Sequence, residues 1–394
     1  MIPDFTIIGA GIFGLTSAIE LRNRGHSVKI ISPGQIPHPL AASDDISKIV
    51  RMEYGGDTFY MEAVDQCIDI WHDWNLEFGE TVYHETGFVL LCSQSMEEAS
   101  QDYEWSSFNH LISRGHIPER LSEDEINSRF PAFKPGKYKD GFFHARAGYA
   151  ESGRVVALLK NKALNLGIDV IEGIEIKGVI SENGKATHLL THRGASLAIG
   201  NCIVATGAET VSIIPEMSPY LVATGHPVYH LKPERTQDFI PAHFPVFAAD
   251  ISNSGWYGFP FHPQSGVVKI ANHGIGINMN AQTDARVLRQ GDIKLLKTFL
   301  HESIPPLEKV PVVYTRRCLY SDTRDGHFWI DKHPKYNNIT IAAGGSGHGF
   351  KMAPLLGKWI CAAAEGRSGD VPERFRARRF DIDATNQEEA RVSG

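Results

Sequence analysis

The chain has 394 residues, and its 39 Lys and Arg against 46 Asp and Glu give a formal net charge of −7. This acidic balance argues against a nucleic-acid-binding protein, which carries a basic patch, and 42% hydrophobic with 22% charged residues is typical of a globular chain. No apolar run reaches membrane-spanning length, and five scattered Cys without a CxxC pair exclude a disulfide framework or a zinc ribbon. We therefore expect about two domains, no metal site and no nucleic-acid or membrane partner.

The two ends of the sequence match no targeting signal. Asp4, Glu20 and Arg22 interrupt the first apolar residues, so these do not form the apolar region of a signal peptide. The last four residues, Arg-Val-Ser-Gly, differ from an SKL-type peroxisomal signal. The sparse cysteines fit a reducing compartment. We expect a cytoplasmic protein.

The first 34 residues predict a strand, a glycine loop, a helix and a second strand. Residues 5–8 are a short apolar β run, and apolar residues recur at helical spacing from Leu15 to Leu21. Basic residues in the last turn and Gly25 after it are typical of a helix end. Residues 28–31 form the next β run. The result is a βαβ unit in about 30 residues, the size of a dinucleotide-binding motif.

Gly9, Gly11 and Gly14 form a GxGxxG motif inside that unit. The first glycine permits a tight turn, the second lets the backbone approach a pyrophosphate, and the third lets the helix pack against the strand. Ile12 and Phe13 would open the helix, whose N-terminus would face the phosphates. Where NAD-binding proteins have an acid on the ribose, this second strand ends at Ser32, which weakens the case for NAD.

Further elements follow in chain order. Amphipathic spacing predicts helices over 59–78 and 153–166, and 169–171 is an expected strand. A hairpin is expected around Arg193-Gly194, and residues 216–270 hold short β runs among Pro, Gly and aromatic residues. Strands at 201–205 and 339–343 each end in a glycine turn, and the charged tail after about residue 367 is expected to be partly disordered.

Nucleotide-type signals therefore occur at the start, middle and end of the chain. A discontinuous nucleotide-binding domain (1–80, 150–215 and 325–394) with an inserted substrate domain (81–149 and 216–324) explains them best. The fingerprint lies at the N-terminus, and glycine turns recur at Gly207 and at Gly345, Gly347 and Gly349. Several close backbone approaches suit a cofactor stretched across the domain, so we favour FAD over NAD.

Two side chains, considered without any resemblance to a family, have ordinary structural explanations. A single cysteine such as Cys318 is usually a small buried hydrophobe, although Arg316 and Arg317 before it would favour its thiolate if they lie close. A strand lysine such as Lys269 is usually at the surface. Its apolar neighbours place it in a buried strand, where an unpaired lysine is costly.

Four segments together resemble the sarcosine oxidase and fructosyl-amino acid oxidase branch of the D-amino-acid-oxidase superfamily. The resemblance covers roughly residues 4–365. It is carried by Ile7-Ile8-Gly9-Ala10-Gly11, by Ser47-Lys48-Ile49-Val50-Arg51 with Tyr54-Gly55, by Arg317-Cys318-Leu319-Tyr320 followed by Phe328-Trp329-Ile330-Asp331 and His333-Pro334, and by Gly345-Ser346-Gly347-His348-Gly349-Phe350-Lys351.

The resemblance implies roles for the cofactor residues. The cysteine that matches Cys318 is bound through sulfur to the 8α carbon of FAD, which would raise the cofactor's potential and prevent its loss. Lys48 matches a basic residue over the flavin. His348 lies in the glycine loop beside the flavin's pyrimidine end. The other cofactor contacts would come from Ser47, Phe350 and the remaining residues of the two glycine loops.

The resemblance also assigns reaction residues. Lys269 matches a lysine where O₂ is reduced, and a fixed cation there would stabilise the superoxide anion as it forms. Arg51 and Lys351 match the pair that binds the substrate carboxylate, a role that suits the forked guanidinium of arginine. His273 and Tyr257 match residues of the substrate pocket, which we count as catalytic.

The implied fold is α/β, with a glutathione-reductase-like FAD domain and an inserted, mostly antiparallel β substrate domain. The implied reaction is O₂-dependent oxidation of the C–N bond of an N-alkyl, N-methyl or N-fructosyl amino acid, which gives H₂O₂. Pipecolate-type cyclic imino acids and saccharopine stay open as substrates. A dehydrogenase with an electron-transfer partner and a non-catalytic FAD-binding protein stay open as other classes. We expect a monomer.

Overall fold

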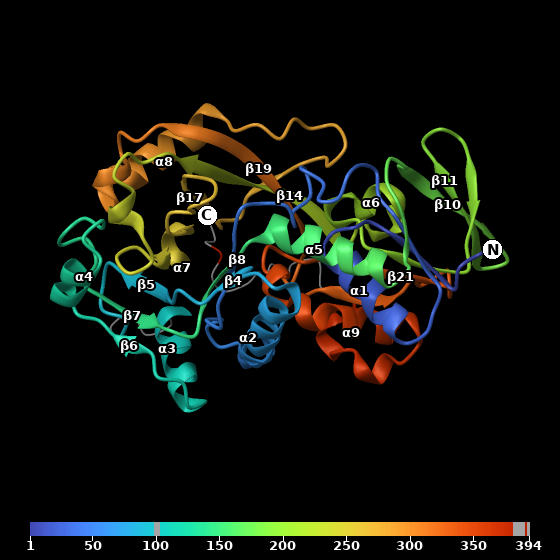
Figure 1. Ribbon diagram of the computed structural model, residues 1–394, viewed down its shortest axis with the longest axis horizontal. Helices are drawn as coiled ribbons and strands as arrows, with labels where there is room; N and C mark the ends of the chain where they lie inside the picture. Colours follow the sequence, from blue (N-terminus) through green and yellow to red (C-terminus); the bar gives the residue numbers. More distant parts are fainter. Residues whose placement is uncertain (98–102, 381–390, 392–394) are drawn as a thin grey trace.

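The computed structural model describes residues 1–97, 103–380 and 391 of the chain. Two β-sheet regions lie side by side in Figure 1, and the N-terminus lies at the end of the right-hand one. The helices in the described ranges include none with the length and apolar character that crossing a bilayer requires.

The first region is built on a six-stranded sheet. Its strands are parallel except β20, which runs antiparallel to its neighbour. Every residue of β1 is buried, as expected of a strand covered on both faces. The order across the sheet is β20 (Trp329–Lys332), β21 (Ile339–Ala343), β13 (Asn201–Val204), β1 (Phe5–Ile8), β2 (Val28–Ile31) and β9 (Asp169–Ile171).

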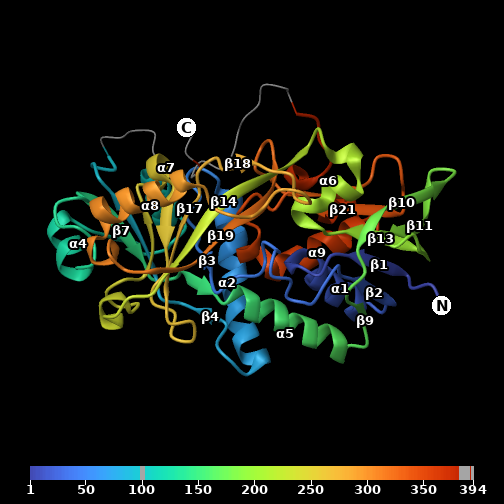
Figure 2. The same ribbon diagram turned by 90° about the horizontal axis from the view of Figure 1, so that it is seen from above.

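Helix α1 (Ile12–Asn23) packs against α9 (Ala353–Ala364) and α5 (Ser152–Asn165). A methyl group on Gly357 of α9 would lie 2.5 Å from the Thr16 carbonyl oxygen of α1, so this close crossing requires glycine. The contact joins the first and last parts of the chain, and Figure 2 shows α5 along one edge of the same region.

The second region contains a nine-stranded sheet, mostly antiparallel, in which only the β5–β15 pair described is parallel. Strand β14 crosses from this sheet towards the first region, paired along its length with β19 (Figure 1). The order is β18 (Ile277–Asn278), β14 (Leu221–Leu231), β17 (Val268–Asn272), β16 (Trp256–Gly258), β15 (Val246–Ala249), β5 (Phe88–Cys92), β7 (Asp140–His144) and β6 (Glu119–Arg120), with β19 (Val312–Thr323) beside β14.

Shorter elements complete the fold. Helix α2 (Thr58–Phe78) lies in the middle of the molecule (Figure 1), and α3 (Tyr103–Ser113), α4 (Glu123–Arg129), α7 (Ile251–Ser254) and α8 (Gln290–Ser303) belong to the second region. One three-stranded sheet has the order β3 (Lys48–Val50), β8 (Gly148–Ala150), β4 (Tyr83–His84). The other has the order β10 (Ile176–Glu182), β11 (Lys185–Thr191), β12 (Ser196–Ala198), and α6 (Thr210–Ile213) follows β13.

The α/β class and the βαβ unit are confirmed, and the two long helices fall within one residue of their expected bounds. The hairpin around Gly194 is present as β11 and β12. The expectation of short β runs after residue 216 is wrong for β14, which has 11 residues. The domain boundaries at 80, 150, 215 and 325 stay a prediction.

Residues 368–380, the first part of the tail that is expected to be partly disordered, pack against the rest of the chain. Phe375 is fully buried and packs against Phe328 and Phe59, and Arg374 pairs with Asp57 at 2.7 Å. The many charged residues of this segment gave no indication that Phe375 is buried. The residues that bury Phe375 come together only in the tertiary structure. Residues 381–390 and 392–394 of the predicted tail lie outside the described residues.

Candidate active site

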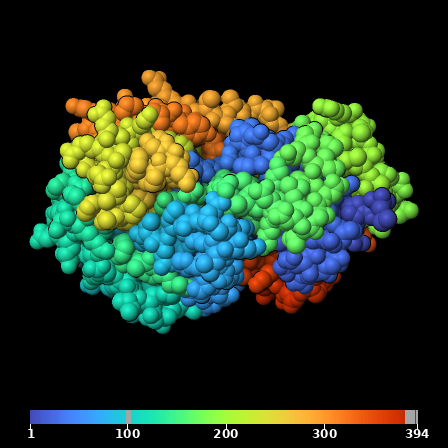
Figure 3. Space-filling view, viewed as in Figure 1, coloured from blue at the N-terminus to red at the C-terminus, as the bar shows by residue number. Residues whose placement is uncertain are grey.

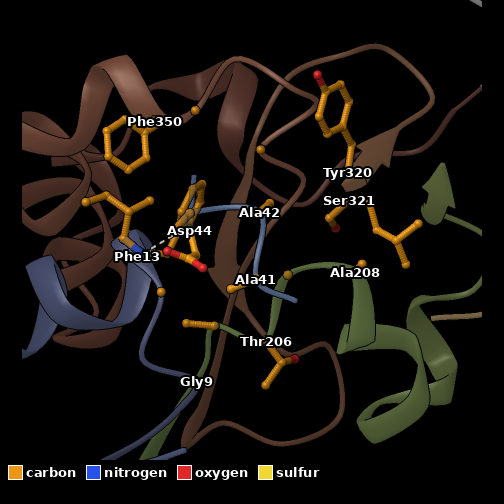
Figure 4. A pocket seen from close by; sticks show the side chains of 18 of the residues that line it. Gly9, Phe13, Ala41, Ala42, Asp44, Thr206, Ala208, Tyr320, Ser321 and Phe350 are labelled. Atoms are coloured by element: carbon orange, nitrogen blue, oxygen red, sulfur yellow. Dashed lines mark hydrogen bonds between the residues drawn. The ribbon is translucent and has the colours of Figure 1, made fainter. Parts of the chain in front are cut away.

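A single continuous cavity extends along the carboxyl ends of the parallel strands into the second region. Figure 4 shows Gly9, Thr206 and Ala208 towards one end, and Phe350 and Tyr320 at the other, with Ala41 and Ala42 between them. In Figure 3 the blue N-terminal loop reaches the surface between the orange and green segments. Of the predicted site residues, the lining includes Gly9, Gly11, Ile12, Phe13, Ser32, Lys48, Arg51, Gly207, Tyr257, His273, Gly345, Gly347, His348, Gly349, Phe350 and Lys351.

In the first glycine loop, Gly9 and Gly14 leave no room for a side chain. Gly9 has a φ of +99°, and a methyl group there would lie 2.4 Å from the Ala205 carbonyl oxygen. A methyl group on Gly14 would lie 1.9 Å from the Gly9 carbonyl, so the third glycine allows α1 to start directly against the strand. Gly14 itself does not line the cavity. The backbone N–H of Ile12 at the start of α1 donates to the Ser43 hydroxyl (3.0 Å).

The second glycine loop follows β21 and packs closely against residues of both regions. Gly347 has a φ of +75°, and a methyl group there would lie 2.5 Å from the Tyr320 ring. A methyl group on Gly349 would lie 3.1 Å from the Phe13 ring. His348 between them donates from Nε2 to the Gly326 carbonyl (2.9 Å), which fixes the orientation of its ring.

These residues fit FAD. Gly9, Ala10 and Gly11 line the cavity before α1, where a glycine loop lets the backbone approach a pyrophosphate. Ser32 lines the cavity at the end of β2, where a ribose hydroxyl can bond. A second glycine loop further along the same cavity allows another close approach of the backbone. The donors would be provided by backbone and hydroxyl groups over an extended length, as a dinucleotide needs.

Arg51 and Lys351 line the same cavity and are both buried. The Arg51 guanidinium lies 5.9 Å from the Phe88 ring centre and donates to the Tyr103 hydroxyl. The Tyr103 hydroxyl in turn donates to the Glu53 carbonyl (2.5 Å). We call Arg51 and Lys351 the ring-backed pair. Two buried cations at one end of a cavity suit an anionic group such as a carboxylate.

Tyr257 and His273 lie near one another, with ring centres 6.4 Å apart, and Tyr320 lies 5.9 Å from His273. Burial raises the pKa of the Tyr257 and Tyr320 hydroxyls. Sequence reasoning missed Tyr320 as a site residue. The signal was present, because Tyr320 follows Cys318 by two residues and therefore shares its face of β19.

Lys269 lies in a buried strand, as its apolar neighbours predict, and it is paired. Its side chain is 1% exposed, and Nζ donates to Asp45 Oδ2 (2.7 Å) and to the Ser47 carbonyl (2.5 Å). Burial lowers the pKa of Lys269 to about 8, and Asp45 opposes that shift. Lys269 lies behind the residue 45–48 segment and is absent from the cavity lining, as is Ser47.

Asp45 is the centre of a buried charge cluster that sequence reasoning also missed. Lys48 Nζ lies 3.5 Å and an Arg316 nitrogen 3.6 Å from its Oδ2. Burial alone would raise the pKa of Asp45, but the charges of Lys269 and Lys48 outweigh burial and hold the pKa well below its ordinary value. We call Asp45, Lys269, Lys48 and Arg316 the Asp45 cluster. Three cations surround one carboxylate, so the cluster has a net positive charge when Lys269 is protonated.

Cys318 lies on β19 directly before residues of the cavity wall, and does not itself line the cavity. It is buried in a small cluster with Ala271, Val228 and Tyr320, against which Tyr257 packs. The next residue, Leu319, and Tyr320 both line the cavity. Cys318 is therefore adjacent in sequence to a residue that lines the cavity. Attachment of the flavin to its sulfur stays a prediction.

A parallel sheet with glycine turns at its carboxyl edge, joined to a second sheet whose residues Tyr257 and Tyr320 line the same cavity, defines a dinucleotide-binding oxidoreductase. Residues 4–363 match the model of the DAO family, described as FAD dependent oxidoreductase. The chain belongs to this family, and it is an FAD-dependent oxidoreductase.

Three relatives illustrate the similarity. The chain is 27% identical over 362 residues to peroxisomal sarcosine oxidase from Homo sapiens, with 90% of each chain covered. It is 28% identical over 411 residues to L-saccharopine oxidase from Schizosaccharomyces pombe, covering 95% of this chain and 92% of the relative. A crystal structure of a double-cysteine mutant of amadoriase I from Aspergillus fumigatus superposes with a TM-score of 0.82 at 21% identity, over 98% of this chain and 93% of that one. This last similarity concerns the fold.

Proposed function

We propose that the protein oxidises the C–N bond of an N-substituted amino acid, with O₂ as the final acceptor and H₂O₂ as the product. The observation that carries this proposal is the ring-backed pair, which places two buried cations in the same cavity as both glycine loops. An amino acid carboxylate bound there would present its amine to the cofactor. Relatives named for sarcosine and saccharopine oxidation support the same substrate class.

FAD, when bound, supplies the redox chemistry: it takes two electrons and a proton from the amine as a hydride equivalent and passes the electrons to O₂. The chain's own residues bind and orient the substrate. Arg51 and Lys351 would hold the carboxylate, and Tyr257, His273 and Tyr320 would enclose the amine. Enclosure by aromatic rings favours the uncharged amine, because burial disfavours an ammonium group. The imine product would then be hydrolysed by water.

For O₂ we propose that Lys269 provides the positive charge. A cation fixed beside the site of O₂ reduction stabilises the anion that forms. The Asp45 cluster holds this lysine at one position, and Lys48 of the same cluster lines the cavity.

N-alkyl and N-fructosyl amino acids rank first as substrates, and cyclic imino acids of the pipecolate type rank second. The similarity to L-saccharopine oxidase favours saccharopine as a further candidate. A location in the cytoplasm and a monomeric state stay predictions.

The test is a substrate screen with sarcosine, pipecolate, saccharopine and fructosyl-valine. Peroxide release under air and anaerobic bleaching of the flavin absorbance are measured for each. Bleaching with peroxide release supports an oxidase, whereas bleaching without peroxide points to a dehydrogenase that uses another acceptor. If no secondary amine bleaches the flavin, the proposed function is wrong.

We further propose that FAD is covalently bound through Cys318. Acid-precipitated protein should remain yellow, and Cys318→Ala should release FAD into the supernatant. Cys202, which is buried in the other sheet, provides the matched control, because Cys202→Ala should leave the precipitate yellow. A colourless wild-type precipitate would contradict covalent attachment.

A further inference from the structure

The ring of Tyr54 contacts both members of the ring-backed pair. Lys351 Nζ lies 4.6 Å and the Arg51 guanidinium carbon 5.4 Å from the centre of this ring. Both distances fall within the range of cation–π attraction, in which the negative face of the ring stabilises a cation and leaves its charge intact. Tyr54 is itself buried, at 2% exposure.

Tyr54 is held from its far end by the second glycine loop. Its hydroxyl lies 3.0 Å from Nδ1 of His348. Because the Gly326 carbonyl can only accept, Nε2 of His348 carries a proton, and in the neutral ring Nδ1 accepts from Tyr54. The Tyr54 ring also stacks on Tyr60, with ring centres 5.0 Å apart and planes 23° apart. These contacts leave the ring little freedom to turn.

From this geometry we infer that Tyr54 is a positioning residue for carboxylate recognition. Its ring sets the spacing of the Arg51 and Lys351 charges, and its hydroxyl couples that spacing to the glycine loop that borders the cofactor cavity. The two cations come from distant parts of the chain, and like charges repel at close range. A single polarisable ring in contact with both lowers the cost of keeping them together. This inference rests on the proposed carboxylate site and adds the residue that organises it.

The experiment compares two ligands of the same shape, propionate and its uncharged amide propionamide, by calorimetric titration of the holoenzyme. The ratio of their dissociation constants isolates carboxylate recognition and needs no turnover. Tyr54→Leu should lower the preference for propionate about tenfold, which corresponds to about 1.4 kcal/mol. Flavin content per chain is measured alongside.

Two further variants keep the test valid if the leucine protein folds poorly. Replacement of Tyr54 by phenylalanine removes the hydroxyl only, and replacement by 3,4,5-trifluorophenylalanine also withdraws electron density from the ring face at nearly constant shape. The loss of preference for propionate should be smallest with phenylalanine, larger with trifluorophenylalanine and largest with leucine. Tyr60→Phe is the matched control, because Tyr60 is equally buried and its hydroxyl also bonds a histidine ring, that of His327.

The outcomes separate this inference from the proposed function. If wild-type protein binds propionate no better than propionamide, the carboxylate site itself is wrong. If the wild type discriminates and trifluorophenylalanine at position 54 discriminates equally well, Tyr54 does not organise the pair. Equal weakening of both ligands would indicate a purely structural role and would also overturn the inference.

Discussion

One group of cations lines the cavity and a second lies mostly outside its lining, and the surroundings of the two groups differ. Aromatic rings contact the ring-backed pair, and the buried Glu53 carboxylate acts on Arg51, whereas the carboxylate at the centre of the Asp45 cluster bonds directly to Lys269. A ring face stabilises a cation without cancelling its charge. A carboxylate cancels one positive charge, and its ion pair with a lysine exists only while the lysine is protonated. The first arrangement suits an anion that arrives with the substrate. The second suits a fixed charge whose strength can vary with pH.

The difference also reflects where each group lies in the fold. Arg51 and Lys351 come from the segments after β3 and after the second glycine loop, and both line the cavity. Lys269 is on β17 and Arg316 on β19, inside the second sheet, and Asp45 reaches them from the loop after β2. Arg51 and Lys351 therefore depend on contacts near the first region, whereas Lys269 depends on a loop that joins the two regions.

The largest expected effect separates the two groups by half-reaction. Lys269→Met keeps length and apolar packing but removes the charge. Loss of about 4 kcal/mol of electrostatic stabilisation should slow reoxidation by O₂ roughly a thousandfold, while anaerobic reduction by substrate stays nearly unchanged. Stopped-flow traces of each half-reaction measure this. Equal slowing of both would indicate a structural lysine, and slowing of reduction alone would place Lys269 with the substrate.

The ring-backed pair should give the opposite pattern. Arg51→Ala or Lys351→Ala removes one charge-assisted contact to the carboxylate, worth about 1.5–3 kcal/mol. The apparent affinity for the substrate should fall roughly 10- to 150-fold. Reoxidation of the reduced enzyme should stay close to wild type. Steady-state kinetics with substrate and O₂ varied separately measure both, and an unchanged KM and kcat/KM would place the carboxylate site elsewhere.

The smallest expected effect is a shift in pH dependence. The pKa of Lys269 is lowered to about 8 by burial, so its charge is present below that pH and lost above it. If the charge serves O₂, the reoxidation rate should fall as the pH rises through about 8. Asp45 raises this pKa, so Asp45→Asn should move the fall in rate to lower pH.

Stopped-flow reoxidation over a pH range on both sides of the transition measures this shift. Asp44→Asn is the matched control, since it changes the neighbouring acid and leaves the contact between Asp45 and Lys269 in place. If Asp45→Asn leaves the pH dependence of the reoxidation rate unchanged, Asp45 does not set the pKa of Lys269.

The sequence by itself determined the features that depend on local spacing. The GxGxxG motif between an apolar strand and a helix predicted the first βαβ unit, because only glycine allows the Gly9 turn and the contact between Gly14 and Gly9. Helical spacing predicted α2 and α5. The four family segments contain part of the cavity lining, including Gly9, Arg51 and Lys351, although the roles of these residues in the reaction stay predictions.

Only the tertiary structure decided which side chains act on one another. Asp45 and Lys269 are 224 positions apart, and no local pattern indicates that they pair. Tyr54 and Lys351 likewise meet through the packing of β3 and α2 against the end of the second glycine loop. Spacing along the chain specifies turns and faces of elements, whereas the charge that a buried cation carries depends on neighbours that folding brings from distant segments.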